Sequence, residues 1–234
     1  MELTPTAFKR IVKDVKSIMK EPLHDSGIYY VHDEENVTKG YALIMGPSET
    51  PYAHGNYFFE IDYPYDYPYS PPKFTFLTNG DNIRINPNLY RNGKVCISIL
   101  NTWKGEPWSS CQTIQTVLLT LLTIFNDKPL LNEPGYDETS SDFVPYNEII
   151  RFKNIEIAII KVLKGELIPH IVKKFDKEVW DKFLENYDII VNTIKKKNTI
   201  QRITTRLYNM NIKTNYKEVK KQLLELYKSR EINK

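Results

Sequence analysis

Residues 86–100 read NPNLYRNGKVCISIL and place a single cysteine, Cys96, just after a turn signal. The Asn-Gly pair at 92–93 favours a tight turn. A cysteine between two branched apolar residues is more often a small buried hydrophobic side chain. The positive charges of Arg91 and Lys94 favour a reactive thiolate instead. The stretch therefore permits either a structural or a chemical role for Cys96.

The sequence around this stretch predicts a long loop between a small sheet and a set of helices. Residues 79–108 show no sustained period, and loops of that length in compact domains are usually functional. Four β-rich runs before the loop predict an antiparallel meander, and they are Ile28–Val31, Tyr41–Met45, Asn56–Tyr63 and Lys73–Leu77.

Helices are expected on both sides of this sheet. The first is expected from Pro5, capped by Thr4, with an apolar stripe through Phe8, Ile11, Val12, Val15 and Ile18 and a stop at Pro22. The second is expected over Ser110–Phe125, with Ser109 and Gln112 as a capping box. Beyond Pro145 we expect only helices, over Asn147–Lys164, Ile168–Ile194 and a last one capped by Asn215 through Leu226.

The order helix, meander, long loop and helices is an α+β pattern. Net charge divides the chain, because residues 1–150 hold 12 Lys and Arg against 19 Asp and Glu, whereas residues 151–234 hold 20 against 10. We therefore expect an acidic domain over residues 1–165 and a basic helical extension over residues 166–234. Its apolar stripes are expected to pack on that domain.

Composition excludes several classes of protein. No window of 18 apolar residues exists, so we expect neither a membrane span nor a signal peptide. Two cysteines make no disulfide framework, and four scattered histidines have no metal-ligand spacing. These features predict a reducing compartment, the cytoplasm or nucleus, and the excess of lysine over arginine indicates an AT-rich genome such as that of a parasite or virus.

A cysteine protease is a poor match. His54 is the one histidine placed to approach Cys96, and nothing in the sequence orients it. Cys111 falls at the start of the second predicted helix, where the helix dipole could lower its pKa. Its place two residues after the capping Ser109 favours a buried structural role instead.

A series of motifs in a fixed order carries a family resemblance. They are Gly46-Pro47…Pro51-Tyr52…Gly55, Tyr63-Pro64…Tyr67-Pro68…Pro71-Pro72, Asn86-Pro87-Asn88, Cys96 eight residues after Asn88, Trp108-Ser109 and Asn132-Glu133-Pro134-Gly135. Over about residues 5–165 this series resembles the ubiquitin-conjugating (E2) enzymes, and within that family it is most similar to the large type Z branch, which carries a C-terminal helical extension. The resemblance implies the E2 (UBC) fold.

The resemblance also implies transthiolation. Cys96 would accept ubiquitin, or a ubiquitin-like protein, from an activating enzyme (E1) as a thioester and pass it to a substrate lysine, usually with a ligase (E3). Asn88 would stabilise the oxyanion or brace the loop. Glu133 would either position the incoming lysine or be a solvated acid in a proline-rich turn. The motif's usual histidine is replaced by Asn86, and because that histidine serves structure in the family, activity is still expected. No cofactor is implied, since ATP is consumed in the E1 step.

Three partner surfaces follow from the same resemblance. Lys9, Arg10 and Lys13 on the first helix would meet the E1, or form an ordinary solvated face of that helix. Tyr69 matches the aromatic residue of a loop that ligases touch, and Ser109 begins a second such loop. That second loop reads Ser-Ser-Cys where the family has Ser-Pro-Ala, which leaves the ligase class open.

Two rival functions remain to be weighed. A non-catalytic, ubiquitin-binding E2 variant usually lacks the cysteine, which is present here. The runs 195–197 and 220–221 of lysines would permit nucleic-acid binding, but the aromatic residues near them follow helix-core spacing instead of forming a stacking surface. The expected partners are therefore proteins, not nucleic acid or membrane.

Overall fold

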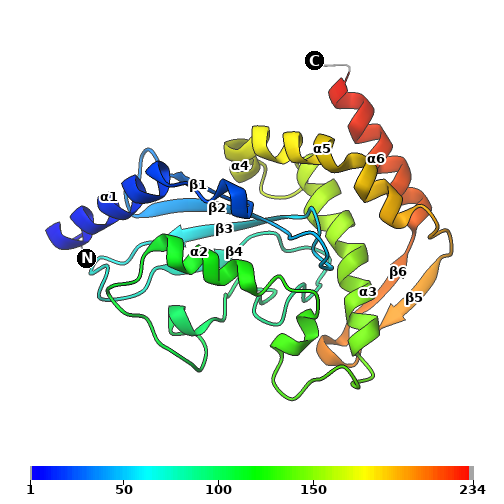
Figure 1. Ribbon diagram of the computed structural model, residues 1–234, viewed down its shortest axis with the longest axis horizontal. Coiled ribbons are helices and arrows are strands. Elements are labelled where there is room, and N and C mark those ends of the chain that lie inside the picture. Colours follow the sequence, from blue (N-terminus) through cyan, green and yellow to red (C-terminus); the bar gives the residue numbers. More distant parts are fainter. Residues whose placement is uncertain (1, 232–234) are drawn as a thin grey trace.

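Four antiparallel strands form the sheet of this computed structural model, which describes residues 2–231 (Figure 1). The strands are β1 (Ile28–His32), β2 (Lys39–Met45), β3 (Asn56–Asp62) and β4 (Lys73–Phe76). They pair in chain order, β1-β2-β3-β4, so the predicted meander is confirmed. A two-stranded sheet, described below, lies in the C-terminal part.

The first helix, α1 (Pro5–Lys20), begins and ends near the predicted residues. The Thr4 hydroxyl accepts the cap hydrogen bond from the Ala7 amide at 3.1 Å. The predicted stripe is rotated, because Phe8 is 49% exposed whereas Ala7, Ile11, Asp14 and Ile18 are buried. The helix therefore turns a narrower face, with one buried carboxylate, toward β1 and the second helix.

The second helix, α2 (Ile114–Thr123), starts four residues later than predicted. Its capping box is Thr113 with Thr116, directly before the apolar stripe. Gln112 does accept a hydrogen bond from the Ser109 amide at 2.9 Å, but the pair closes a separate turn. Cys111 lies in that turn and is exposed, so the predicted burial at a helix start is wrong.

Short helical turns and one long helix complete the domain. The turns are η1 (His24–Ser26), η2 (Ser98–Leu100) and η3 (Pro129–Asn132). The long helix begins as α3 (Phe143–Lys153), continues through the π-helical segment η4 (Asn154–Lys161), and is followed by Gly165 in the left-handed region at φ +68°. The side-chain oxygen of Asn154 accepts a hydrogen bond from the Tyr57 hydroxyl at 2.6 Å, which joins this helix to β3.

The C-terminal part is not wholly helical. It comprises α4 (Pro169–Val172), η5 (Lys173–Phe175), α5 (Asp176–Ile194), β5 (Gln201–Thr204), η6 (Leu207–Asn209), β6 (Asn211–Thr214) and α6 (Tyr216–Glu231). The prediction of helix from Pro145 onward is wrong over the β5–β6 hairpin, where Ile203 pairs with Ile212 and, on β6, branched residues alternate with Asn211 and Lys213. Helix α6 begins as predicted, since the Asn215 side chain accepts from the Glu218 amide.

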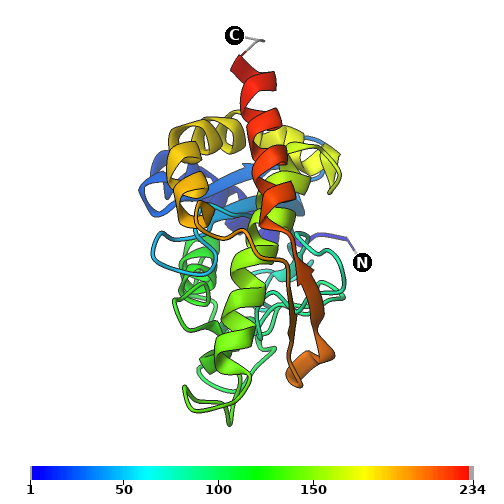
Figure 2. The ribbon, with the colours of Figure 1, turned by 90° about the vertical axis from the view of Figure 1, so that its right-hand side faces the viewer.

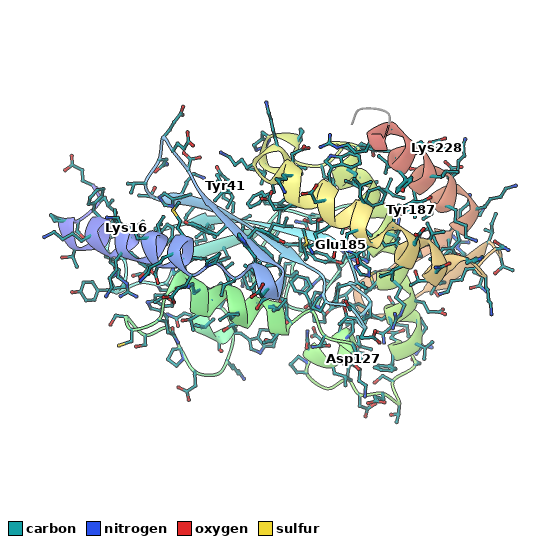
Figure 3. All side chains as sticks on the ribbon, turned by 45° about the horizontal axis from the view of Figure 1, so that its top comes forward. Lys16, Tyr41, Asp127, Glu185, Tyr187 and Lys228 are labelled. Carbon is teal, nitrogen blue, oxygen red and sulfur yellow. The ribbon has the colours of Figure 1, made fainter. Side chains whose placement is uncertain are left out.

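The extension covers the face of the sheet that points away from α2. Tyr57 on β3 packs against Phe125, just past α2, with ring centroids 4.6 Å apart. The next residue, Phe58, points to the opposite face, and its ring lies 5.8 Å from that of Phe175 in η5. Because neighbouring strand residues face opposite ways, both faces of β3 are buried. Figure 3 shows the side chains of the sheet and of the extension from another side, with Tyr41 labelled on β2 and Glu185 on α5.

Apolar packing dominates this contact. Apart from a pair between the sequence neighbours Lys164 and Glu166, one ion pair within residues 2–231 joins the extension to residues before 166. It links Lys174 to Asp33 at 3.9 Å, while the Lys174 ammonium also lies 5.0 Å over the Tyr41 ring.

Within residues 2–231, none of the helices combines the length and the apolar character that a membrane span needs.

Phe175→Ala should destabilise the fold, because it opens a cavity between η5 and the sheet. We expect a loss of about 3–5 kcal/mol in the free energy of unfolding, measured by urea denaturation. Phe8→Ala removes the same atoms from an exposed site and should change stability by less than about 0.5 kcal/mol. Equal effects of the two substitutions would contradict the docking of the extension.

Candidate active site

Cys96 lies in the long loop and is held there by two hydrogen bonds to one residue. Its amide donates to the Asn88 carbonyl at 2.8 Å, and the Asn88 side-chain amide donates to the Cys96 carbonyl at 2.7 Å. The structure thus brings the predicted nucleophile and the predicted oxyanion residue into direct contact. Cys96 is only 2% exposed, and the Asn88 Oδ1 is buried with no partner among the described residues.

Asn86 fixes this pair to the rest of the protein. Its side-chain oxygen accepts from the Asn88 amide at 2.9 Å, and its nitrogen donates to the Tyr52 hydroxyl and to the Ile124 carbonyl, both at 2.8 Å. Asn86 is fully buried. Burial holds the pKa of Tyr52 well above its usual value, so this hydroxyl stays neutral. The residue in the place of the motif's histidine therefore has a structural role.

The buried cation Arg84 also binds the backbone of the loop that contains Cys96. Its guanidinium donates to the carbonyls of Asn86 and Pro87, at 3.2 and 2.6 Å. One face lies 3.3 Å from the centre of the Tyr90 ring, and the guanidinium lies 4.9 Å from the Tyr208 ring. Among the side chains of residues 2–230 no carboxylate forms an ion pair with it, and the carbonyls and aromatic rings that contact it offset part of its lost hydration.

Glu133 lies at the end of η3 and is half-buried. Its carboxylate accepts a hydrogen bond from the hydroxyl of Tyr208, a residue of the C-terminal hairpin. Burial, and then this hydrogen bond to an anion, raise the pKa of Tyr208. Sequence reasoning missed Tyr208, since 75 residues separate it from Glu133 and no motif surrounds it.

The predicted E1-binding residues divide into two kinds. Lys9 and Lys13 are exposed. Arg10 is instead tied down, because its guanidinium donates to the backbone carbonyls of Ser110 and Gln112 and to the buried carboxylate of Asp14. Arg10 therefore joins α1 to the turn before α2.

The two predicted ligase-binding loops are held side by side by Trp108. Its indole N–H donates to the Pro68 carbonyl at 2.7 Å. Tyr69, next to Pro68, is 73% exposed, and Ser109, next to Trp108, is also exposed.

The positive charges predicted to favour a thiolate at Cys96 are engaged elsewhere, since Arg91 donates to the Tyr208 carbonyl and Lys94 lies over the Tyr90 ring. The described residues contain no cluster of three or more His, Cys, Asp or Glu suited to a metal ion.

A family model described as ubiquitin-conjugating enzyme matches residues 10–153. The chain belongs to this family, whose members are transferases that carry their modifier on a cysteine, and the predicted UBC fold is confirmed. It is similar to ubiquitin-conjugating enzyme E2 Z, with 41% identity to the Xenopus tropicalis protein over 76% of this chain and 42% identity to the human protein over 69%. These matches support the type Z resemblance.

The chain spans 57% of the length of the Xenopus relative and 46% of the human one. Among solved structures, human ubiquitin-conjugating enzyme E2 G1 aligns with 28% identity and a TM-score of 0.46, over 53% of this chain and 97% of that one.

Asn86→Ala should lower stability because it leaves the Tyr52 hydroxyl and the Ile124 carbonyl short of a buried partner. We expect a loss of about 1–3 kcal/mol in the free energy of unfolding. Asn211→Ala, which removes an exposed asparagine side chain on β6, should cost less than about 0.5 kcal/mol. An unchanged denaturation midpoint for Asn86→Ala would show that the network does not hold the loop.

Proposed function

We propose that this protein is an E2 enzyme that accepts ubiquitin, or a ubiquitin-like protein, on Cys96 and transfers it to substrate lysines. The observation that carries the proposal is the network of Asn86, Asn88 and Cys96, in which family motif residues meet through hydrogen bonds. In loading, the Cys96 sulfur attacks the thioester carbonyl of the E1 adduct, and the E1 thiol leaves. In discharge, a lysine amine attacks the new thioester, loses a proton, and the Cys96 thiol leaves.

The role proposed for Asn88 combines the two predicted ones. A side-chain amide nitrogen carries two protons. One is used on the Cys96 carbonyl, which braces the loop, and the other is available to the oxyanion that forms when the amine attacks. The proposal for Glu133 is that its carboxylate holds the incoming lysine, whose unperturbed pKa is near ~10.4.

The partners proposed are the E1, an E3 and the modified proteins. Lys9 and Lys13 are accessible for an E1, whereas Arg10 is proposed to act through the position of α1. Tyr69 and Ser109 form an exposed pair of loop residues for an E3. The chain needs no cofactor in this scheme, because ATP is used by the E1, and a reducing compartment would protect the free thiols.

One observation favours a second candidate, a protein that binds the modifier without carrying it. Cys96 is buried, whereas Cys111 is exposed. Loading with a panel of modifiers decides between the candidates. An adduct that disappears with dithiothreitol identifies an E2 and its modifier, whereas binding of a modifier without any adduct identifies the binding protein.

Cys96→Ser should convert the thioester, which dithiothreitol cleaves by thiol exchange, into an oxyester that resists it, as read on a gel after incubation with E1 and ATP. Cys111→Ser should load at the rate of the unmodified protein, although accessibility alone would favour Cys111 as the nucleophile. Loss of the adduct in Cys111→Ser would show that the motif assigns the wrong cysteine.

Asn88→Ala should separate loading from discharge. Both steps pass through a tetrahedral oxyanion, but a thiolate attacks and leaves readily, so exchange between two thiols depends less on a donor than attack by an amine does. Loss of such a donor costs about 2.7–4 kcal/mol in other enzymes. We expect near-normal loading and at least tenfold slower discharge to free lysine, followed by single-turnover assays. Equal slowing of both steps would assign Asn88 to bracing alone.

A further inference from the structure

The tip of the C-terminal hairpin, residues 205–210, lies beside the start of α3 (Figure 2). A buried carboxylate fixes it there, because Asp142 accepts hydrogen bonds from the Arg206 and Leu207 amides at 3.0 and 2.7 Å. Within the tip, the Thr205 hydroxyl donates to the Leu207 carbonyl at 2.7 Å. The tip is thus a built structure anchored to the UBC domain.

From this tip, Tyr208 contacts both Glu133 and the loop that contains Cys96. Its hydroxyl donates to Glu133, its carbonyl accepts from Arg91 at 2.6 Å, and its ring lies over Arg84 and 6.2 Å from the Tyr146 ring. Its backbone is left-handed at φ +62°, a region that tyrosine rarely adopts. Such a conformation persists only where surrounding contacts determine it, and it is typical of functional sites.

The hydrogen bond from Tyr208 holds one of the two carboxylate oxygens of Glu133. The Tyr208 hydroxyl engages Oε2, and within residues 2–231 no other side-chain hydrogen bond reaches this carboxylate. The Oε1 atom therefore keeps its lone pairs for an incoming ammonium group. Because the raised pKa of Tyr208 keeps its hydroxyl protonated, the anchor persists at the pH values at which lysine begins to lose its proton.

We infer that Tyr208 is a positioning residue for lysine discharge, which acts by holding the Glu133 carboxylate beside the Cys96 loop. The inference rests on the proposed function, since it assigns a task within the transfer step. It makes the C-terminal hairpin a part of the active site and not only an element packed on α3. Loading from the E1 does not involve an incoming lysine and is independent of this contact.

The test is Tyr208→Phe, which removes one hydroxyl and keeps the ring over Arg84. We expect loading of Cys96 within twofold of the unmodified protein and at least threefold slower discharge to free lysine in single-turnover assays. Tyr187→Phe is the matched control, because Tyr187 stacks on Tyr227 between α5 and α6, away from Glu133. It should leave both rates unchanged.

A double-mutant cycle with Glu133→Gln gives the readout that a merely structural role would not move. If Tyr208 acts through Glu133, the combined variant discharges no more slowly than Glu133→Gln alone. Glu133→Asp keeps the charge, but its shorter side chain withdraws the carboxylate from the Tyr208 hydroxyl. It should therefore slow discharge as Tyr208→Phe does, and it tests the inference if Tyr208→Phe does not fold.

Three results would overturn the inference: unchanged discharge in Tyr208→Phe, slowing factors that multiply in the combined variant, or normal discharge in Glu133→Asp. The unmodified protein keeps the two levels of the proposal apart. If it forms no thioester on Cys96, the proposed function fails; if it loads and discharges while Tyr208→Phe matches it, only the role of Tyr208 fails.

Discussion

The buried guanidinium of Arg84 is the constraint on which the site depends. Removing a charge from water costs several kcal/mol or more unless polar groups replace the lost hydration. Here the Asn86 and Pro87 carbonyls and the rings of Tyr90 and Tyr208 supply that replacement. The cysteine loop must therefore curve around Arg84, and the C-terminal hairpin must cover it. One cation couples parts of the chain that are far apart in sequence.

The same coupling recurs at the scale of the whole fold. A four-stranded antiparallel sheet can leave one face in water, but here the extension buries the second face through Phe175 and Phe58. The hairpin then continues along α3 to the cysteine loop (Figures 1 and 2). The basic charge of the extension contributes little to this docking. Among the described residues, the one ion pair between distant residues that joins the extension to residues before 166 is that of Lys174 with Asp33.

Two elements of the structure differ from the prediction, and each difference has a physical cause. The start of α2 was misplaced because two capping pairs lie four residues apart, and only Thr113 directly precedes the apolar stripe. The β5–β6 hairpin was missed because each strand has four residues, too few for alternation to stand out between two helices. Its stability comes from the Ile203–Ile212 pair and from Asp142, neither of which local propensity reveals.

Local features of this protein follow from its amino-acid sequence: helix α1 with its Thr4 cap, the four strands, and the turn that places Cys96 after Asn88. These depend on short-range patterns of side chains and on turn chemistry. The burial of Cys96, the exposure of Cys111 and the contact of Tyr208 with Glu133 arise from tertiary packing. Apolar burial, which docks the extension, has no direction of its own. Contacts between residues 75 positions apart therefore exist only once every element has packed.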